Sequence, residues 1–185
     1  NGFVGKLIRY IGKEAHAGGA PHLGINALNA ANIGLAALAA QRETFQDKDH
    51  IRVHPIMNKG GDLVNVVPAN VRLETYVSGS NMEAILDASF KVSRAFKAGG
   101  DAVGAKCEIT DLPGYLPTIQ NYDLFDIMYE NMKEVFGDEK FVRYENTAGG
   151  GSTDAGDISY LMPMIHSYFI GAEGIGHSEN YEIAD

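Results

Sequence analysis

His16 stands where a loop could carry it to a substrate. It occupies the segment Gly-Lys-Glu-Ala-His-Ala-Gly at residues 12–18, between a strand-like and a helix-like stretch. Functional side chains concentrate in loops that regular elements hold in place. An imidazole N–H at such a position can donate to an oxyanion that develops during a reaction, and one such donor typically contributes about 100- to 1,000-fold in rate. The plain alternative is a surface histidine with no chemical role.

Asn65 is a second candidate, in the segment Val-Asn-Val-Val-Pro-Ala at residues 64–69. Its side-chain amide can donate to a carboxylate and accept from an N–H at the same time. The alternative is a turn residue that precedes a strand bounded by Pro68.

A glycine loop at residues 149–157 offers backbone N–H groups to an anion or a carbonyl. It reads Gly-Gly-Gly-Ser-Thr-Asp-Ala-Gly-Asp and leads into a predicted helix, whose N-terminus favours negative charge. The loop lacks the Gly-Lys-Ser/Thr of a nucleotide-binding loop and the second glycine of a hydrolase nucleophile elbow. The N–H groups at Gly151, Ser152 and Thr153 could meet an anion or a carbonyl, although Ser152 or Thr153 could be a simple helix cap.

His177 is a candidate metal ligand, in the segment Gly-Ile-Gly-His-Ser at residues 174–178. A neutral imidazole on a glycine-rich loop can bind zinc, but a zinc site needs about three protein ligands. Asp154, Asp157 and Glu173 are near in sequence without a recognised ligand spacing. One histidine alone predicts no complete site.

The segments before residue 112 predict a sheet covered by two helices. Residues 3–12 and 51–57 are strand-like, the second segment broken by Pro55, and alternation of apolar and polar residues marks strands at 71–77 and 103–110. Residues 26–45 are rich in Ala and Leu and favour a helix. Ser80 and Glu83 form a capping box for another helix, which we expect to end at Gly99-Gly100 and to bury Met82, Ile85, Leu86, Phe90, Val92 and Phe96.

This order of elements predicts an α+β, ferredoxin-like βαββαβ domain over residues 1–112, with an antiparallel sheet and both helices on one side. A stiff Pro-Gly-Tyr-Leu-Pro segment at 113–117 then marks the boundary between this domain and the second part of the chain, residues 113–185. There we expect an amphipathic helix at 122–136 with a buried apolar stripe, a short strand at 141–144, a short helix at 153–161 and a buried strand at 164–170.

Composition excludes several classes of partner. The formal net charge of the 185 residues is −9, and neither nucleic acid nor an anionic membrane surface favours such a chain. Cys107 is the single cysteine and alternates inward on a predicted strand, so we expect an inert core thiol and a reducing, cytoplasmic location. The chain starts without Met and ends without a closing element, which suggests a piece of a longer protein.

The motifs, taken in order, resemble the aminoacylase and glutamate-carboxypeptidase superfamily of metal-dependent amidohydrolases. The matching segments are residues 12–18, 20–27, 60–69, 151–154 and 176–178. The branch that looks most similar includes aminobenzoyl-glutamate hydrolase, hippurate hydrolases and auxin-conjugate hydrolases. The resemblance extends across essentially the whole chain.

The resemblance implies a two-metal α/β catalytic domain interrupted by a ferredoxin-like lid that forms a homodimer. It implies that His16 stabilises the oxyanion in the active site of the partner protomer, that Asn65 holds a substrate carboxylate, and that His177 is a metal ligand. Residues 1–112 would be the lid, and residues 113–185 the C-terminal part of the catalytic domain, with the loop at 149–154 lining the substrate cleft.

The reaction implied is hydrolysis of the amide bond of N-acyl or N-aroyl amino acids by metal-activated water, with a glutamate as general base. Zinc is the first choice for the two metals and manganese the second. The glutamate and the other ligands are expected before Asn1, so we expect this chain alone to be inactive. Relatives usually carry Arg where Ser78 stands, which leaves carboxylate binding to Asn65 or another residue.

A different function stays open on the same fold: a non-catalytic dimerisation or ligand-sensing module. It explains residues 1–112 but not the motifs after Pro113. In either case an open sheet edge needs a partner or a cover, so we expect the two lids of a dimer to pair through edge strands.

Overall fold

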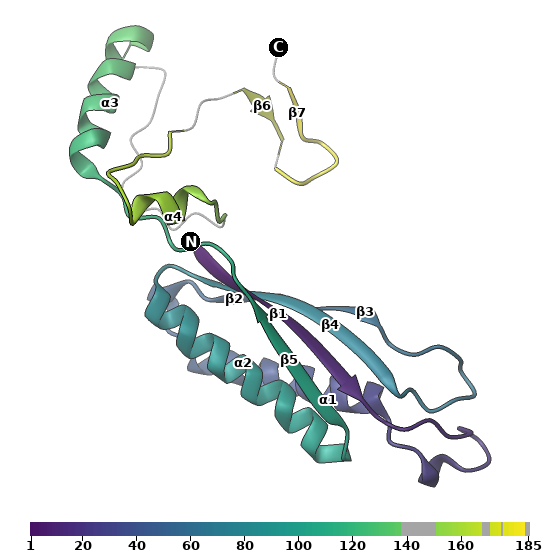
Figure 1. The fold of residues 1–185 in the computed structure, drawn as a ribbon. Helices are drawn as coiled ribbons and strands as arrows, with labels where there is room; N and C mark the ends of the chain where they lie inside the picture. The colour runs from purple at the N-terminus through teal and green to yellow at the C-terminus, as the bar shows by residue number, and fades with distance from the viewer. Residues whose placement is uncertain (138–150, 168–170, 175, 184–185) are drawn as a thin grey trace.

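An antiparallel sheet organises the first 112 residues (Figure 1). The computed structural model describes residues 1–137, 151–167, 171–174 and 176–183. The strands are β1 (Gly2–Ile11), β2 (Arg52–Val53), β3 (Ile56–Lys59), β4 (Asn70–Gly79) and β5 (Lys106–Leu112). Their order is β2-β4-β1-β5, and β3 also pairs with β4. With β2 and β3 counted as one interrupted strand, this is the ferredoxin-like βαββαβ arrangement that the sequence predicted.

Alternation along β1 and β4 separates a buried face from an exposed one. Ile8 and Tyr10 of β1 and Leu73 of β4 are at most 1% exposed, whereas Leu7, next to Ile8 in sequence, is 39% exposed. Pro55 interrupts the second strand as predicted, because proline cannot donate to the ladder. The buried face therefore carries the core.

Two helices cover that face and contact each other closely. They are α1 (Ala27–Gln41) and α2 (Met82–Val103), and their small buried residues belong to one core cluster with the sheet. A Cβ on Gly99 of α2 would lie 2.3 Å from the carbonyl oxygen of Ala30 and 2.6 Å from the nitrogen of Gly34, both in α1. Near this contact, the hydroxyl of Tyr10 donates to the carbonyl of Phe96 at 2.6 Å.

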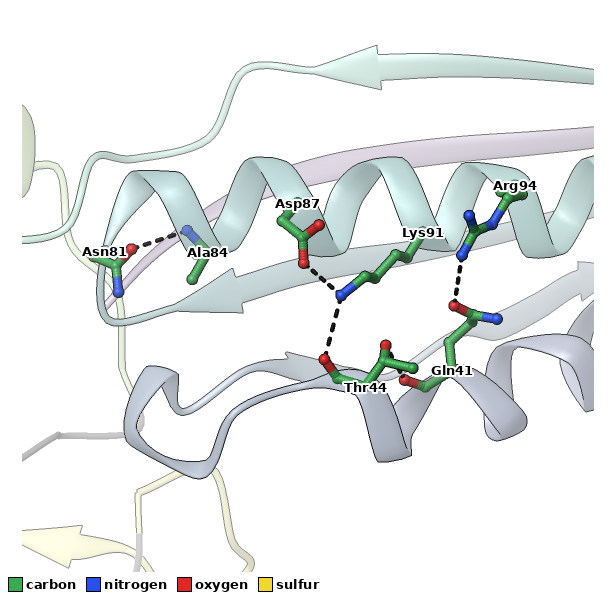
Figure 2. A network of polar contacts seen from close by, with 7 residues as sticks. All are labelled: Gln41, Thr44, Asn81, Ala84, Asp87, Lys91 and Arg94. Atoms are coloured by element: carbon green, nitrogen blue, oxygen red, sulfur yellow. Dashed lines mark hydrogen bonds and ion pairs between the residues drawn. The ribbon is translucent and has the colours of Figure 1, made fainter.

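Polar contacts join the end of α1 to the outer side of α2, as Figure 2 shows. Lys91 pairs with Asp87 at 2.6 Å and also donates to the carbonyl of Thr44 at 3.2 Å. Arg94 donates to the Gln41 side chain at 3.1 Å. Short 3-10 turns flank α1 in the sequence: η1 (Pro21–Leu23) precedes it, and η2 (Arg42–Thr44) and η3 (Asp47–Asp49) follow it.

The start and the end of α2 differ from the prediction. The cap is Asn81, whose side-chain oxygen accepts from the nitrogen of Ala84 at 2.9 Å, while the hydroxyl of Ser80 donates to the carbonyl of Lys48. The predicted capping box is therefore wrong. The helix also continues through Gly99 to Val103, and its C-cap is Gly104, whose φ of 76° suits glycine.

The buried face of α2 is also rotated from the predicted one. Leu86 and Phe90 are 58% and 66% exposed, whereas Ala88, Ser89 and Ala95 are buried. Small side chains at the inner positions let α2 approach α1, and Leu86 and Phe90 lie outward. Ile85, Val92 and Phe96 are buried as predicted.

After residue 112 the elements are short and bury little. They are α3 (Tyr122–Phe136), α4 (Ala155–Ser159), β6 (Ala172–Glu173) and β7 (Glu182–Ile183), and β6 pairs with β7. No residue of α3 is buried, and Val135 is 74% exposed, so the predicted burial of its apolar stripe is wrong in this chain. The apolar residues of this amphipathic helix thus stay at least partly exposed.

Two other predictions concern the same region. Residues 164–167 form no strand, residues 168–170 lie outside the described part, and so does the strand expected at 141–144. The main chain of Leu116 donates to Asp157 at 2.8 Å and that of Phe3 to Tyr115 at 2.9 Å, which ties this region to the start of β1. Across the described ranges, every helix is too short or too polar to serve as a membrane span.

Replacing Gly99 by Ala should destabilise the chain by about 1–3 kcal/mol, because a methyl group there meets the backbone of α1. This cost exceeds the roughly 1 kcal/mol that alanine gains over glycine in a helix. Urea unfolding followed by circular dichroism measures it, with exposed Lys97→Ala on the same helix as the control. An unchanged or higher midpoint for Gly99→Ala would contradict the close helix contact.

Candidate functional site

Two loops at one end of the sheet form a single hydrogen-bonded unit. The β1–β4 ladder ends where Ile11 pairs with Asn70. Beyond it the nitrogen of Gly12 donates to the carbonyl of Ala69 at 2.8 Å, that of Val67 to Ala15 at 2.9 Å, and that of Ala17 to Asn65 at 2.9 Å. The loop that carries His16 is thus fixed to the loop that carries Asn65.

The same unit is anchored to the start of α1. Lys13 and Ile25 exchange two backbone hydrogen bonds of 2.9 Å, and the nitrogen of Ala27 donates to the carbonyl of Pro68 at 2.8 Å. Gly12 permits this closure, since a Cβ there would lie 2.1 Å from the carbonyl oxygen of Ile25. The Asn26 side chain accepts from the nitrogens of Leu28 and Asn29 and caps α1.

His16 is exposed and its ring is oriented by its own turn. It forms an isolated bridge with Val66, one residue out of register with the β1–β4 ladder. Its Nδ1 accepts from the nitrogens of Gly18 and Gly19 at 3.2 and 2.9 Å. Nε2 forms no hydrogen bond with any of the described residues, so this nitrogen is the one that can meet a ligand.

Asn65 is exposed at the tip of its loop, after the exposed apolar residues Leu63 and Val64. Its carbonyl accepts from Ala17, and its side chain contacts no described residue through a hydrogen bond. The structure therefore brings the backbones of His16 and Asn65 together, as the sequence interpretation requires. Both side chains are available to a ligand.

The other candidate substrate-binding residues lie at the opposite end of β1. The carbonyl of Gly151 is 3.2 Å from the nitrogen of Asn1, at the start of that strand. Thr153 Oγ1 accepts from the nitrogen of Ala155 at 3.3 Å just before α4, whose N-cap is Asp154, and Ser152 is half-buried next to it in sequence. Gly149 and Gly150 lie outside the described residues. Ten residues of β1 separate the two groups by about 33 Å, at roughly 3.3 Å per residue.

His177 is exposed in a turn, with a left-handed φ of 64°. Among the described residues, no three His, Cys, Asp or Glu side chains gather in a way that could hold a metal ion. His177 could supply one ligand, and a catalytic zinc needs about three from protein. The described residues of this chain do not by themselves form a metal site.

Ser78, where the resemblance noted from the sequence leads us to expect an arginine, faces a neighbouring strand. It pairs in register with Arg52 of β2, and its hydroxyl donates to the carbonyl of that residue at 3.4 Å. The Arg52 side chain is exposed. The guanidinium group of Arg52 thus lies on the strand next to Ser78, where an arginine was expected.

Lys6 is a charged residue that the sequence interpretation missed. It is 1% exposed on the helix-covered face, and its Nζ donates to Ser93 at 2.9 Å and to Asp111 at 2.5 Å. The sequence could have indicated its burial, because Lys6 lies two residues before Ile8 and therefore on the same face of β1. Its partners satisfy the buried charge, so the contact joins α2 to β5 and offers no free group to a substrate.

Cys107 is half-buried beside Tyr10. Burial raises the pKa of its thiol to about 11, against smaller opposing effects from a hydrogen bond with Tyr10 and from Lys97. Burial also raises the pKa of Tyr10 above its usual range. A neutral thiol is a poor nucleophile, which supports the expectation of an inert core cysteine.

Comparisons with known proteins identify the family of the chain. The sequence profile of a family described as the peptidase dimerisation domain matches residues 1–96. The chain is 33% identical over 178 residues to the Xaa-Arg dipeptidase of Mus musculus, covering 94% of this chain and 40% of that enzyme. It is 42% identical over 74 residues, or 40% of this chain and 17% of the relative, to a p-aminobenzoyl-glutamate hydrolase homolog from Haemophilus influenzae.

Solved structures support the fold. A tripeptidase from Staphylococcus aureus superposes with a TM-score of 0.72 at 23% identity, covering 97% of this chain and 46% of that chain. An aminobenzoyl-glutamate utilization protein from Klebsiella pneumoniae gives 0.70 at 23% identity, covering 85% and 39%.

At pH 8 the folded chain should react with a thiol reagent far more slowly than the unfolded chain. A rise in pKa from 9.0 to about 11 leaves the thiol neutral below pH 11, and it reduces the thiolate at pH 8 by about 100-fold. Cys107 is the single cysteine, so Ellman's reagent reports it directly, with the chain in guanidinium as the control. Equal rates in the folded and unfolded chains would contradict burial as the cause.

Proposed function

Because the chain belongs to the peptidase dimerisation domain family, we propose that the full-length protein is a metal-dependent amidohydrolase that uses His16 in the active site of a partner protomer. The chain spans 40% of the length of the mouse Xaa-Arg dipeptidase. The residues that we assign to substrate and metal are therefore part of a larger site.

One observation supports action across a dimer. His16 and Asn65 lie at the far end of the sheet, about 33 Å along β1 from the end where Gly151 meets Asn1. A rigid strand of this length cannot fold back on itself. His16 therefore lies too far from Gly151, Ser152 and Thr153 of its own chain to share one small substrate with them.

Twofold symmetry removes this separation. In an isologous dimer the same surface of both copies forms the interface, and paired edge strands run antiparallel. The end of one sheet that carries His16 would then lie beside the end of the other sheet that carries Gly151. The sheet has two open edges, at β2 and β5, within the described residues. Edge pairing there would satisfy unpaired main-chain groups and place His16 at the partner's catalytic part.

The chemistry of the exposed groups fits hydrolysis of an amide next to a carboxylate. The imidazole of His16 would donate to the oxyanion formed when water adds to the amide carbonyl. The side chain of Asn65 would bind the substrate carboxylate, and Gly151, Ser152 and Thr153 would line the cleft. His177 would be one ligand of the divalent metals, zinc or manganese, and the remaining ligands would come from other parts of the full-length protein.

The names of the relatives suggest the substrate class. The Haemophilus relative is named for p-aminobenzoyl-glutamate and the mouse enzyme for dipeptides that end in arginine. Both substrates contain an amide bond to an amino acid with a free carboxylate. We therefore propose N-acyl or N-aroyl amino acids as the class.

In the full-length protein, His16→Ala should lower kcat about 100- to 1,000-fold, because the oxyanion loses one preorganised donor. The control is His22→Ala, which removes another exposed histidine of the same loop. Hydrolysis of p-aminobenzoyl-glutamate with added zinc or manganese provides the assay. Unchanged turnover in His16→Ala would favour the alternative of a non-catalytic dimerisation or sensing module.

A further inference from the structure

Residues 16–20 form a tight turn around the imidazole of His16. The nitrogen of Ala20 donates to the carbonyl of His16 at 2.9 Å, which closes the turn in the main chain. Inside it, the nitrogens of Gly18 and Gly19 both point at Nδ1, at 3.2 and 2.9 Å. In most turns such N–H groups donate to a main-chain carbonyl. Here their acceptor is the side-chain ring of His16.

This contact determines where the ring proton resides. A backbone N–H can donate only to a lone pair, so Nδ1 carries no proton while it accepts from Gly18 and Gly19. In a neutral imidazole the single proton then resides on Nε2. Nε2 is also the nitrogen without a hydrogen bond to any residue in the described part of the chain.

We propose that the main-chain N–H groups of Gly18 and Gly19 are positioning groups that hold His16 as the Nε2–H tautomer. The proposal rests on the proposed function, in which His16 meets the substrate. It deepens that function because it makes the outward nitrogen a donor and not an acceptor. Such a ring suits an oxygen that bears negative charge, and it cannot serve as a general base for water.

The role of these glycines differs from relief of steric strain. A Cβ on Gly18 would lie 3.6 Å from the His16 ring and one on Gly19 would lie 3.4 Å from Nδ1, which are ordinary contacts. Alanine at position 19 therefore fits and keeps the N–H, whereas proline at the same position removes it. The two substitutions separate the hydrogen bond from the shape of the residue.

Nitrogen-15 NMR of the full-length protein, labelled at histidine, tests the proposal without any substitution. The signals of His16 are assigned by their loss in His16→Gln. We expect a protonated Nε2 and an unprotonated Nδ1 near neutral pH. A proton on Nδ1, or an equal mixture of tautomers, would overturn the proposal whether or not His16 takes part in catalysis.

The paired variants test its consequence for the reaction. Gly19→Ala should keep both the tautomer and kcat. Gly19→Pro should shift the nitrogen signals toward a tautomer mixture and lower kcat about three- to tenfold with little change in KM, since one orienting hydrogen bond is lost. Equal nitrogen spectra for the two variants would contradict the role of the Gly19 N–H.

The tautomer and the catalytic role of His16 can fail independently. If His16→Ala retains full turnover while the nitrogen spectrum shows the Nε2–H form, the proposed function is wrong and the tautomer assignment stands. If Gly19→Pro does not fold, the spectrum of the unaltered protein still decides the tautomer.

Discussion

Three backbone hydrogen bonds beyond the regular ladder hold the candidate site together. They join Gly12 to Ala69, Val67 to Ala15 and Ala17 to Asn65, so the two loops continue β1 and β4 past their last paired residues. Each such bond contributes about 0.5–1.5 kcal/mol net. Without them His16 and Asn65 would be side chains on separate, glycine-rich loops. With them, the turn around His16 has a fixed backbone from which to orient its ring.

The core beneath the sheet holds β1 and β4 rigidly, and with them the loops that carry His16 and Asn65. Gly34 and Gly99 let α1 and α2 approach until their backbones meet, and buried Tyr10 links the sheet to α2 through Phe96. The long strands β1 and β4 therefore fix the position of the loops at their ends relative to the core. The same rigidity that keeps His16 oriented also keeps it away from its own chain's residues 151–153, and this makes a second protomer necessary in our proposal.

The strands and the order of elements could be predicted from the local sequence, whereas the cap and the end of α2 and the features that depend on packing could not. Alternation in β4 and β5, the break at Pro55 and the order of elements were enough for the ferredoxin-like fold. The rotation of α2, which exposes Leu86 and Phe90, follows from close contact with α1, which no pattern in α2 alone reveals. His16 could be singled out from its loop, but its hydrogen bonds to Gly18 and Gly19 exist only once the turn has closed.

Mixing two inactive variants tests the donation of His16 between protomers most directly. One full-length variant carries His16→Ala and the other His177→Ala, and both are unfolded and refolded together. In a hybrid dimer one catalytic site keeps its own His177 and receives His16 from the partner, so random pairing should restore about a quarter of the unaltered activity. No activity in the mixture, with hybrid dimers shown to form, would contradict donation across the dimer.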